Sequence, residues 1–269
     1  MASAPLSPGT ASQIAGVAAR LRAAGSVFAE DEAAILLEAA GDDAELDALV
    51  QRRIAGEPLE PLVGWARFGR LRLAVGPGVF VPRQRSLLLA RAAIRIARSQ
   101  ADPIVLEPFC GVAPIAASVA AAVPAAEIHA SDIDPVPLGF ARRNLPDDAN
   151  VVEGSGLAGV PVALRGRVSL VASVPPYVPD AERRFVPREA LEHEPPRALF
   201  AGADGLDHVR ALVADLVGWL RPDGRVLIEL HRAQWSAAAE HARTFGWRPS
   251  RRNGSDGQTV LLVLAPEDG

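Results

Sequence analysis

Two segments of this sequence carry residues whose types and spacing suit ligand binding, and the first of them suits a nucleotide-like ligand. The first, residues 107–114, reads E-P-F-C-G-V-A-P between an apolar run and a helical pattern. Small residues at such a turn let backbone N–H groups and a helix N-terminus approach a ligand. Asp132 follows at the end of the next apolar run, at the spacing where a carboxylate can accept both ribose hydroxyls. A structural turn beside a surface Asp132 is the alternative, and the coincidence of both features favours the ligand site.

The second segment combines a rigid backbone with the single tyrosine of the chain. Residues 173–179 read S-V-P-P-Y-V-P, and Pro175 and Pro176 fix φ and remove two backbone donors. The segment follows a predicted strand, at the sheet edge where ligands of open α/β proteins bind. A stiff loop that presents Tyr177 there suits the positioning of a substrate and a sulfonium methyl group. An ordinary rigid turn is the alternative.

From Pro103 onwards apolar runs alternate with helical stretches, a pattern typical of βαβ units and a parallel sheet. Strands are expected over Ile104–Leu106, Glu127–Ala130, Val151–Glu153, Val168–Ala172, Arg225–Leu230 and Thr259–Leu264, with a turn over 220–224. Helices are expected over 86–98, 114–122, 135–144, 205–220 and 232–245. The fold class is therefore α/β, and both candidate segments stand at strand ends.

The N-terminal part has a different pattern. Apolar residues at a spacing near 3.6 predict three amphipathic helices within residues 10–56. Alternating segments on either side of Gly69 and Arg70 then predict a β-hairpin. We predict a helical recognition domain over residues 1–60, a hairpin linker over 61–78 and a catalytic domain over 79–269.

Composition excludes several classes of protein. The 269 residues are 49% hydrophobic, enough for a large and a small domain. With one cysteine, Cys110, and five scattered His residues, neither a disulfide nor a metal site is expected. The net charge of −4 gives no general attraction to nucleic acid, so no direct nucleic-acid binding is indicated. Neither a signal peptide nor an apolar run of membrane-spanning length is recognisable, so we expect a cytoplasmic protein without a membrane partner.

Further motifs occur in a fixed order: R-I-A-G-E-P-L at 53–59, V-F-V-P-R at 79–83, D-I-D-P at 132–135, P-P-Y at 175–177, H-E-P at 193–195 and G-A-D-G-L at 202–206. In this order they resemble the HemK/PrmC-type protein N5-glutamine methyltransferases, which methylate the GGQ glutamine of peptide release factors. The resemblance runs from the helical domain nearly to the C-terminus. It implies a class I methyltransferase fold, Rossmann-like with a mostly parallel seven-stranded sheet, and S-adenosyl-L-methionine as cofactor.

The resemblance also implies two sets of site residues. Those expected to bind the cofactor are Arg83, Glu107, Phe109, Gly111, Ala113, Asp132, Ile133, Ser155 and Ser173. Those expected at the acceptor and the reaction are Val174, Pro175, Pro176, Tyr177 and Glu194. His193 and Asp180 lie in the same expected region, and they or Glu194 could serve as a base, as binding groups or only as solvated surface.

Several of these positions depart from the family's pattern. Val174 replaces the Asn of N-P-P-Y, whose side chain grips the glutamine amide with one donor and one acceptor. In the first loop Glu107 replaces Asp, and Ala113 stands at a glycine position, where a methyl group would collide if φ is positive. Ser155 stands where an acidic residue near adenine is common, and residues 84–87 read Q-R-S-L in place of P-D-T-E.

Three functions are compatible with these residues. The favoured one is an S-adenosylmethionine-dependent methyltransferase with a changed acceptor, a small molecule or a protein other than the GGQ glutamine. Methyl transfer relies mainly on alignment, so the loss of Asn does not abolish transfer to a different acceptor. The alternatives are an enzyme that reuses the fold and pocket for another reaction on a small molecule, and a catalytically silent binding or partner subunit.

Overall fold

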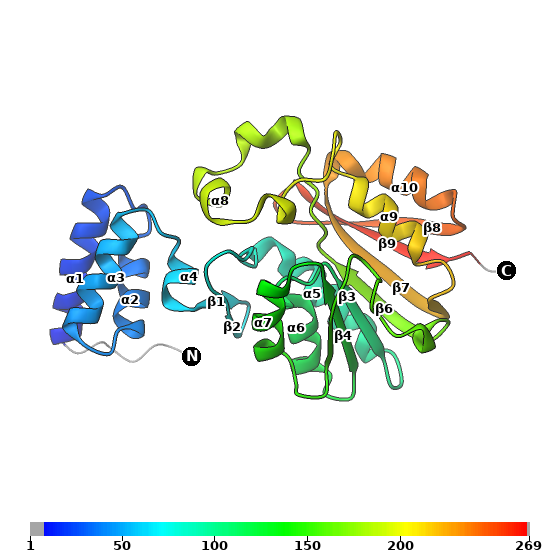
Figure 1. The fold of residues 1–269 in the computed structure, drawn as a ribbon, viewed down its shortest axis with the longest axis horizontal. Helices are drawn as coiled ribbons and strands as arrows, with labels where there is room; N and C mark the ends of the chain where they lie inside the picture. Colours follow the sequence, from blue (N-terminus) through cyan, green and yellow to red (C-terminus); the bar gives the residue numbers. More distant parts are fainter. Residues whose placement is uncertain (1–7, 268–269) are drawn as a thin grey trace. The chain divides into compact units, whose positions relative to one another are not determined.

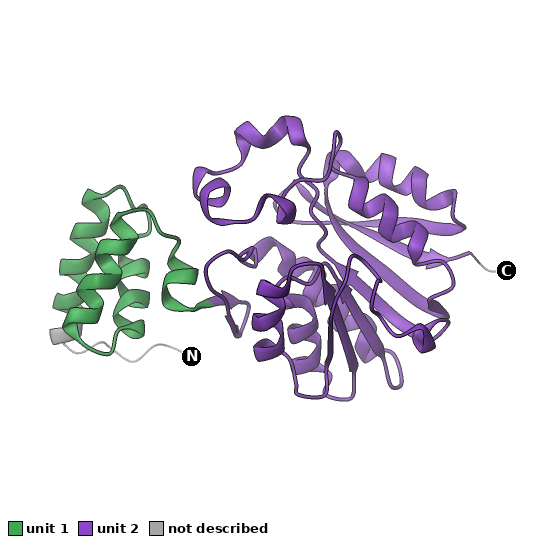
Figure 2. Ribbon diagram, viewed as in Figure 1, with its two compact units in different colours: residues 1–65 green, residues 66–269 purple. Residues whose placement is uncertain are grey.

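The computed structural model describes residues 8–267. The chain divides into two compact units between Trp65 and Ala66 (Figure 2). Each unit has its own buried apolar core. Within the described residues no helix is long and apolar enough to cross a membrane.

The first unit is helical, with α1 at Pro8–Ala23, α2 at Ala29–Ala39, α3 at Asp43–Ile54 and α4 at Leu59–Val63. Asp42 caps α3 by accepting a hydrogen bond from the Glu45 backbone N–H at 2.8 Å. A largely buried ion pair, 2.9 Å between Arg53 and Glu32, ties α3 to α2. The three predicted helices are confirmed. The five-residue α4 was not predicted, because a single turn is too short to show helical periodicity.

The predicted β-hairpin is confirmed as β1, Trp65–Phe68, and β2, Leu71–Ala74. Phe68 and Leu73 are buried in a core of the second unit. The side chain of Asn144 fixes the hairpin further, since it donates to the carbonyl of Ala74 and accepts from its N–H.

A seven-stranded sheet in the order β5-β4-β3-β6-β7-β9-β8 forms the centre of the second unit. Its strands are β3 Ile104–Pro108, β4 Glu127–Asp132, β5 Asn150–Glu153, β6 Val168–Ser173, β7 Leu220–His231, β8 Trp247–Asn253 and β9 Thr259–Pro266. The first five strands in this order run parallel, while β9 lies antiparallel to both β7 and β8. The sheet is thus the mostly parallel, seven-stranded, Rossmann-like sheet that the sequence predicted.

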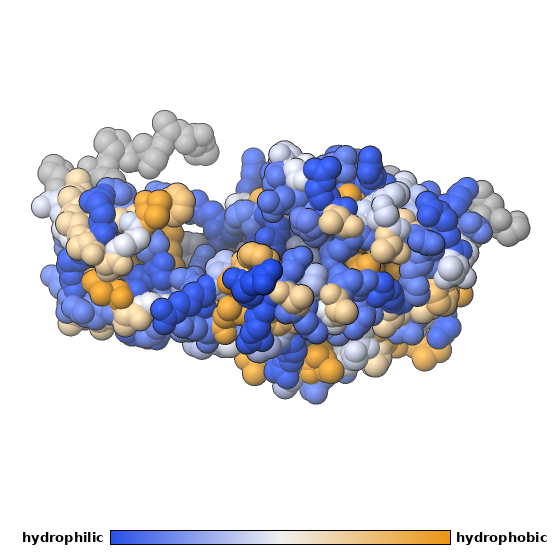
Figure 3. Space-filling model, turned by 90° about the horizontal axis from the view of Figure 1, so that it is seen from above, coloured by the Kyte–Doolittle hydropathy of each residue, from blue (hydrophilic) through white to orange (hydrophobic). Residues whose placement is uncertain are grey.

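Helices cover both faces of this sheet, with α6 and α7 on one side and α9 and α10 on the other (Figure 1). Their bounds are α5 Leu87–Arg98, α6 Pro114–Ala122, α7 Pro135–Asn144, α8 Arg188–His193, α9 Asp207–Asp215 and α10 Trp235–Arg243. Alternate residues of β7 enter the two cores, Val226 and Ile228 on one face and Leu227 on the other. Exposed apolar side chains of the second unit form small groups among hydrophilic ones on the face in Figure 3.

Two features of the sheet differ from the sequence-based predictions. The polar edge strand β8 was not predicted, because Trp247 is its single buried residue and its other positions show no apolar alternation. The predicted turn over residues 220–224 is wrong, because β7 begins at Leu220, which pairs with Val168 across a register shift. Gly224 is required there, since a Cβ would lie 2.8 Å from the Val168 carbonyl oxygen.

Candidate functional site

A cavity of about 370 Å³ lies at the carboxyl ends of β3, β4, β6 and β7. The strand order reverses at this point, since β4 and β5 lie on one side of β3, and β6 and β7 on the other. Ligands of open α/β sheets bind at such switch points. Residues from the segments 78–86 and 195–200 complete the wall.

Glu107 joins the end of β3 to the start of α6. Its carboxylate is 2% exposed and accepts hydrogen bonds from the backbone N–H groups of Ile115 at 3.3 Å and Ala116 at 2.6 Å. These bonds satisfy donors at a helix N-terminus that has no side-chain cap of its own. Burial nevertheless dominates and raises the pKa of Glu107 to about 8.

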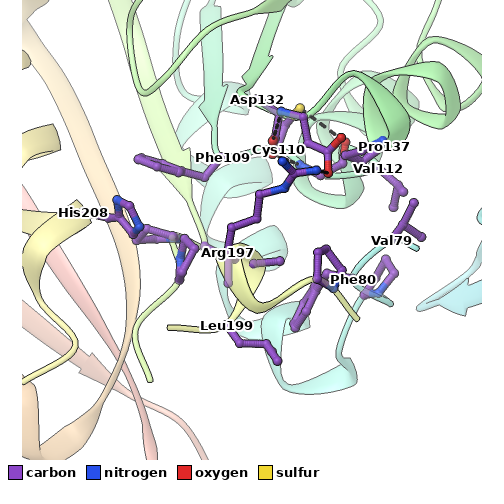
Figure 4. A pocket seen from close by; sticks show the side chains of 18 of the residues that line it. Val79, Phe80, Phe109, Cys110, Val112, Asp132, Pro137, Arg197, Leu199 and His208 are labelled. Atoms are coloured by element: carbon purple, nitrogen blue, oxygen red, sulfur yellow. Dashed lines mark hydrogen bonds and ion pairs between the residues drawn. The ribbon is translucent and has the colours of Figure 1, made fainter. Parts of the chain in front are cut away.

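Three alternate residues of the loop after β3 have left-handed backbones: Phe109 at φ 56°, Gly111 at 53° and Ala113 at 60°. This conformation is rare for a bulky residue such as Phe109, and strain of this kind gathers at functional sites. The Phe109 ring lies beside the His208 imidazole, with centroids 5.3 Å apart, and both line the cavity (Figure 4).

Two acidic residues, at and just after the end of β4, organise the wall next to this loop. Oδ2 of Asp132 accepts from the Gly111 backbone N–H at 2.8 Å, and Oδ1 accepts from that of Asp134 at 2.9 Å. Burial raises the pKa of Asp132, and the two backbone donors oppose this effect. Asp134 caps α7 and pairs with Arg197 at 2.6 Å, so Arg197 points towards this end of β4 (Figure 4).

Val174, Pro175, Pro176 and Tyr177 follow β6 and line the cavity. The Tyr177 hydroxyl donates to Oε1 of Glu229 at 3.2 Å. Burial raises the pKa of Tyr177, so the hydroxyl remains a donor at neutral pH. Gly205 packs against this loop at φ 74°, and a Cβ there would lie 2.2 Å from the Tyr177 carbonyl oxygen. The loop is therefore held rigidly.

Most of the predicted site residues come together at this cavity. Its lining includes Arg83, Glu107, Phe109, Gly111, Asp132, Ile133, Ser155, Val174, Pro175, Pro176 and Tyr177. Ala113, Ser173, Glu194, His193 and Asp180 are not part of it. The Ala113 side chain is buried in an apolar core, and the Ser173 hydroxyl donates to the Pro108 carbonyl at 2.7 Å. Glu194 lies behind the wall, where both its oxygens contact the Arg83 guanidinium at 2.7 Å.

Sequence reasoning missed six charged or polar lining residues: Arg85, Ser86, Asp134, Arg197, His208 and Glu229. Glu229 had a readable signal, because it is a carboxylate inside the apolar run V-L-I-E-L of a predicted strand. His208 and Arg197 come from segments with no chemical pattern. Among the described residues, no group of three or more His, Cys, Asp or Glu side chains could hold a metal ion.

Comparisons with known proteins agree with this architecture. The methylase of ribosomal protein L11 from Lactobacillus delbrueckii subsp. bulgaricus has a similar structure, with a TM-score of 0.51 and 16% identity over 72% of this chain and 84% of that one. No family model matches the sequence. At the sequence level a 4-amino-L-phenylalanine/4-methylamino-L-phenylalanine methyltransferase of Streptomyces pristinaespiralis is 37% identical, over 67% of this chain and 63% of its own length.

Release factor glutamine methyltransferases are also similar in sequence. That of Deinococcus radiodurans is 38% identical over 80% of this chain and 77% of its own length. The enzyme of Streptomyces coelicolor is 37% identical over 74% of this chain and 78% of its own length. Enzymes of this kind use S-adenosyl-L-methionine. The chain therefore belongs to the HemK/PrmC family of S-adenosyl-L-methionine-dependent methyltransferases, the family of the release factor glutamine methyltransferases.

Proposed function

We propose that this methyltransferase acts on an acceptor other than the GGQ glutamine, either a small molecule or another protein. The observation that carries the proposal is Val174, which lines the cavity at the position where the family's motif has Asn. A primary amide that enters this site needs partners for its carbonyl and its N–H groups, and the Val174 side chain offers none. Each buried group left unpaired costs about 1–3 kcal/mol, so transfer to glutamine would lose roughly two orders of magnitude in rate.

The residues of the cavity fit the cofactor. Each oxygen of Asp132 accepts one backbone hydrogen bond, which leaves lone pairs for the ribose hydroxyls. A Cβ at Gly111 would meet no heavy atom within 4 Å, so the loop backbone is open to close approach. When bound, S-adenosyl-L-methionine supplies an electrophilic methyl group. We propose that Asp132 and the loop around Gly111 orient it, while Pro175, Pro176 and Tyr177 form the rigid wall that aligns the acceptor.

A small-molecule acceptor has support from a relative. The Streptomyces pristinaespiralis enzyme is named for a free amino acid with an aromatic amine, so a chain 37% identical to this one carries the name of a small-molecule methyltransferase. The apolar character of Val174 suits an acceptor whose reacting end is less polar than an amide. Loss of the amide grip and retention of the rigid wall are both consistent with such a change.

The test is a methylation assay on a release factor that carries the GGQ loop. Wild-type protein, Val174→Asn and Val174→Thr are compared, with cofactor binding measured by calorimetric titration in each. We expect little transfer by wild type and by Thr, which keeps the shape of Val, and transfer by Asn at a rate about 100-fold higher. Efficient transfer to the glutamine by wild-type protein would overturn the proposal.

A further inference from the structure

Glu229 is a buried carboxylate with one occupied oxygen. Its side chain is fully buried and lines the cavity. Oε1 accepts from the Tyr177 hydroxyl at 3.2 Å and lies 3.5 Å from Nε of Arg85. Oε2 has no hydrogen bond of normal geometry among the described residues. Burial raises the pKa of Glu229, and the nearby Ser86 side chain lowers it. Buried acceptors without a partner are rare in proteins, and each calls for an explanation.

The sheet places this carboxylate beside the acceptor loop. Ser173 at the end of β6 pairs with Ile228 of β7, so Val174, the first residue after β6, and Glu229 of β7 each follow a member of this pair at the sheet edge. The position that lost the polar Asn thus lies next to a carboxylate. An N–H group of an acceptor in front of Val174 can therefore find a hydrogen-bond acceptor that does not come from residue 174.

Two arginines that line the cavity are engaged in closer ion pairs. Arg83 contacts Glu194 at 2.7 Å, and Arg197 contacts Asp134 at 2.6 Å. Arg85 lies further from Glu229 than either of these pairs, and its side chain is 46% exposed. Oε2 is therefore a buried acceptor that lacks a donor, on a residue that lines the cavity, where the lining groups Phe109, Pro175 and Leu199 are apolar.

We propose that Glu229 recognises the acceptor, which is a small amine: its N–H donates to Oε2 while the nitrogen lone pair faces the cofactor side of the cavity. The inference rests on the proposed change of acceptor and specifies its chemical class. Tyr177 is a positioning residue in this arrangement, because its hydrogen bond holds Oε1 and leaves Oε2 without a partner. The Glu229 carboxylate, on the neighbouring strand β7, provides the hydrogen-bond acceptor that an Asn at position 174 would provide.

The test measures binding without cofactor, so it is independent of any methylation assay. Aniline and its isostere toluene, which lacks N–H groups, are titrated into protein with ¹³C-labelled Glu carboxyl groups and followed by NMR. We expect aniline to bind wild type at least about tenfold more tightly than toluene and to shift the Glu229 signal. Glu229→Gln should remove most of this preference, whereas Glu153→Gln, on an exposed residue at the end of β5, should retain it.

Two outcomes would overturn the inference. One is equal affinity of wild type for aniline and toluene, as expected if Oε2 is paired by a water molecule only. The other is a preference for aniline that Glu229→Gln leaves intact. If Glu229→Gln does not fold, Tyr177→Phe serves instead. Without the hydrogen bond that holds Oε1, the preference for aniline should fall while the affinity for toluene is retained, and an undiminished preference would count against the proposal. Methylation of the GGQ glutamine by wild type would refute the proposed function without affecting this binding result.

Discussion

The backbone N–H of Gly111 donates to Oδ2 of Asp132 at 2.8 Å, although 21 residues separate them in sequence. The bond joins the loop after β3 to the end of β4, the two places where the sequence indicated a nucleotide-like site. Because Asp132 also accepts from the Asp134 N–H, the carboxylate is fixed before any ligand arrives. A ligand that binds there meets a hydrogen-bond acceptor that is already positioned, so little conformational entropy is lost in ordering the Asp132 side chain on binding.

Replacement of Asp132 should weaken cofactor binding. Asp132→Asn keeps the shape but loses the charge and one acceptor, so we expect the dissociation constant of S-adenosyl-L-methionine to rise about tenfold or more, and further in Asp132→Ala. Calorimetric titration measures both. Glu153→Gln is the matched control, since Glu153 pairs with Asp132 in the sheet register but is exposed and outside the cavity. Unchanged affinity in both Asp132 variants would place the ribose elsewhere.

Stability should depend on pH through Glu107. Its pKa is about 8 in the folded protein, above the ordinary value of 4.5, so the folded state binds the proton more tightly than the unfolded state. The stabilising contribution is fully present below pH 4.5, falls as pH rises through this window and is lost above about 8. We expect the free energy of unfolding of wild type to decrease from pH 5 to 8 by about 3 kcal/mol relative to Glu107→Gln. Denaturant titrations at each pH measure this, and parallel curves for the two proteins would refute it.

The first unit should serve acceptor recognition and not cofactor binding. All residues that line the cavity lie at position 78 or later, and unit 2 has its own cores. Protein that starts at residue 66 should therefore bind S-adenosyl-L-methionine within about threefold of the full chain, with circular dichroism to verify that it is folded. A folded fragment that loses cofactor and acceptor affinity equally would contradict this division of roles.

Much of the fold was predictable because it depends on local patterns. The bounds of α6 and α7 match the predicted ranges, since Pro114 and Pro135 mark helix starts and apolar runs mark the strands before them. The edge strand β8 was not predictable, because its exposed residues carry no alternation.

The lining of the cavity was predictable where residues stand at or shortly after strand ends, as Asp132 and Tyr177 do. Contacts between distant segments could not be predicted from the sequence. Glu194 contacts Arg83, 111 positions away, and no local sequence pattern indicates that the two side chains meet. The direction of a side chain was equally hidden. Ala113 was expected to bind the cofactor, yet the left-handed backbone at this position turns its methyl group into the apolar core.

Ala113→Gly should change stability little, although it removes a buried methyl group. The residue is fully buried at φ 60°, where a left-handed backbone costs about 1–2 kcal/mol for a residue other than glycine. Relief of this strain offsets the lost burial of about 1 kcal/mol, so we expect a net change within about 1 kcal/mol. Ala117→Gly is the matched control: Ala117 lies in the same core but on α6, has no backbone strain to relieve, and its replacement should cost about 2 kcal/mol.

Because the Ala113 side chain does not line the cavity, cofactor affinity should be unchanged in both variants. Denaturant titration measures the free energy of unfolding of each variant, and an equal decrease in both would show that the Ala113 backbone is not strained. Tighter cofactor binding by Ala113→Gly alone would show that the Ala113 methyl group obstructs the cofactor site.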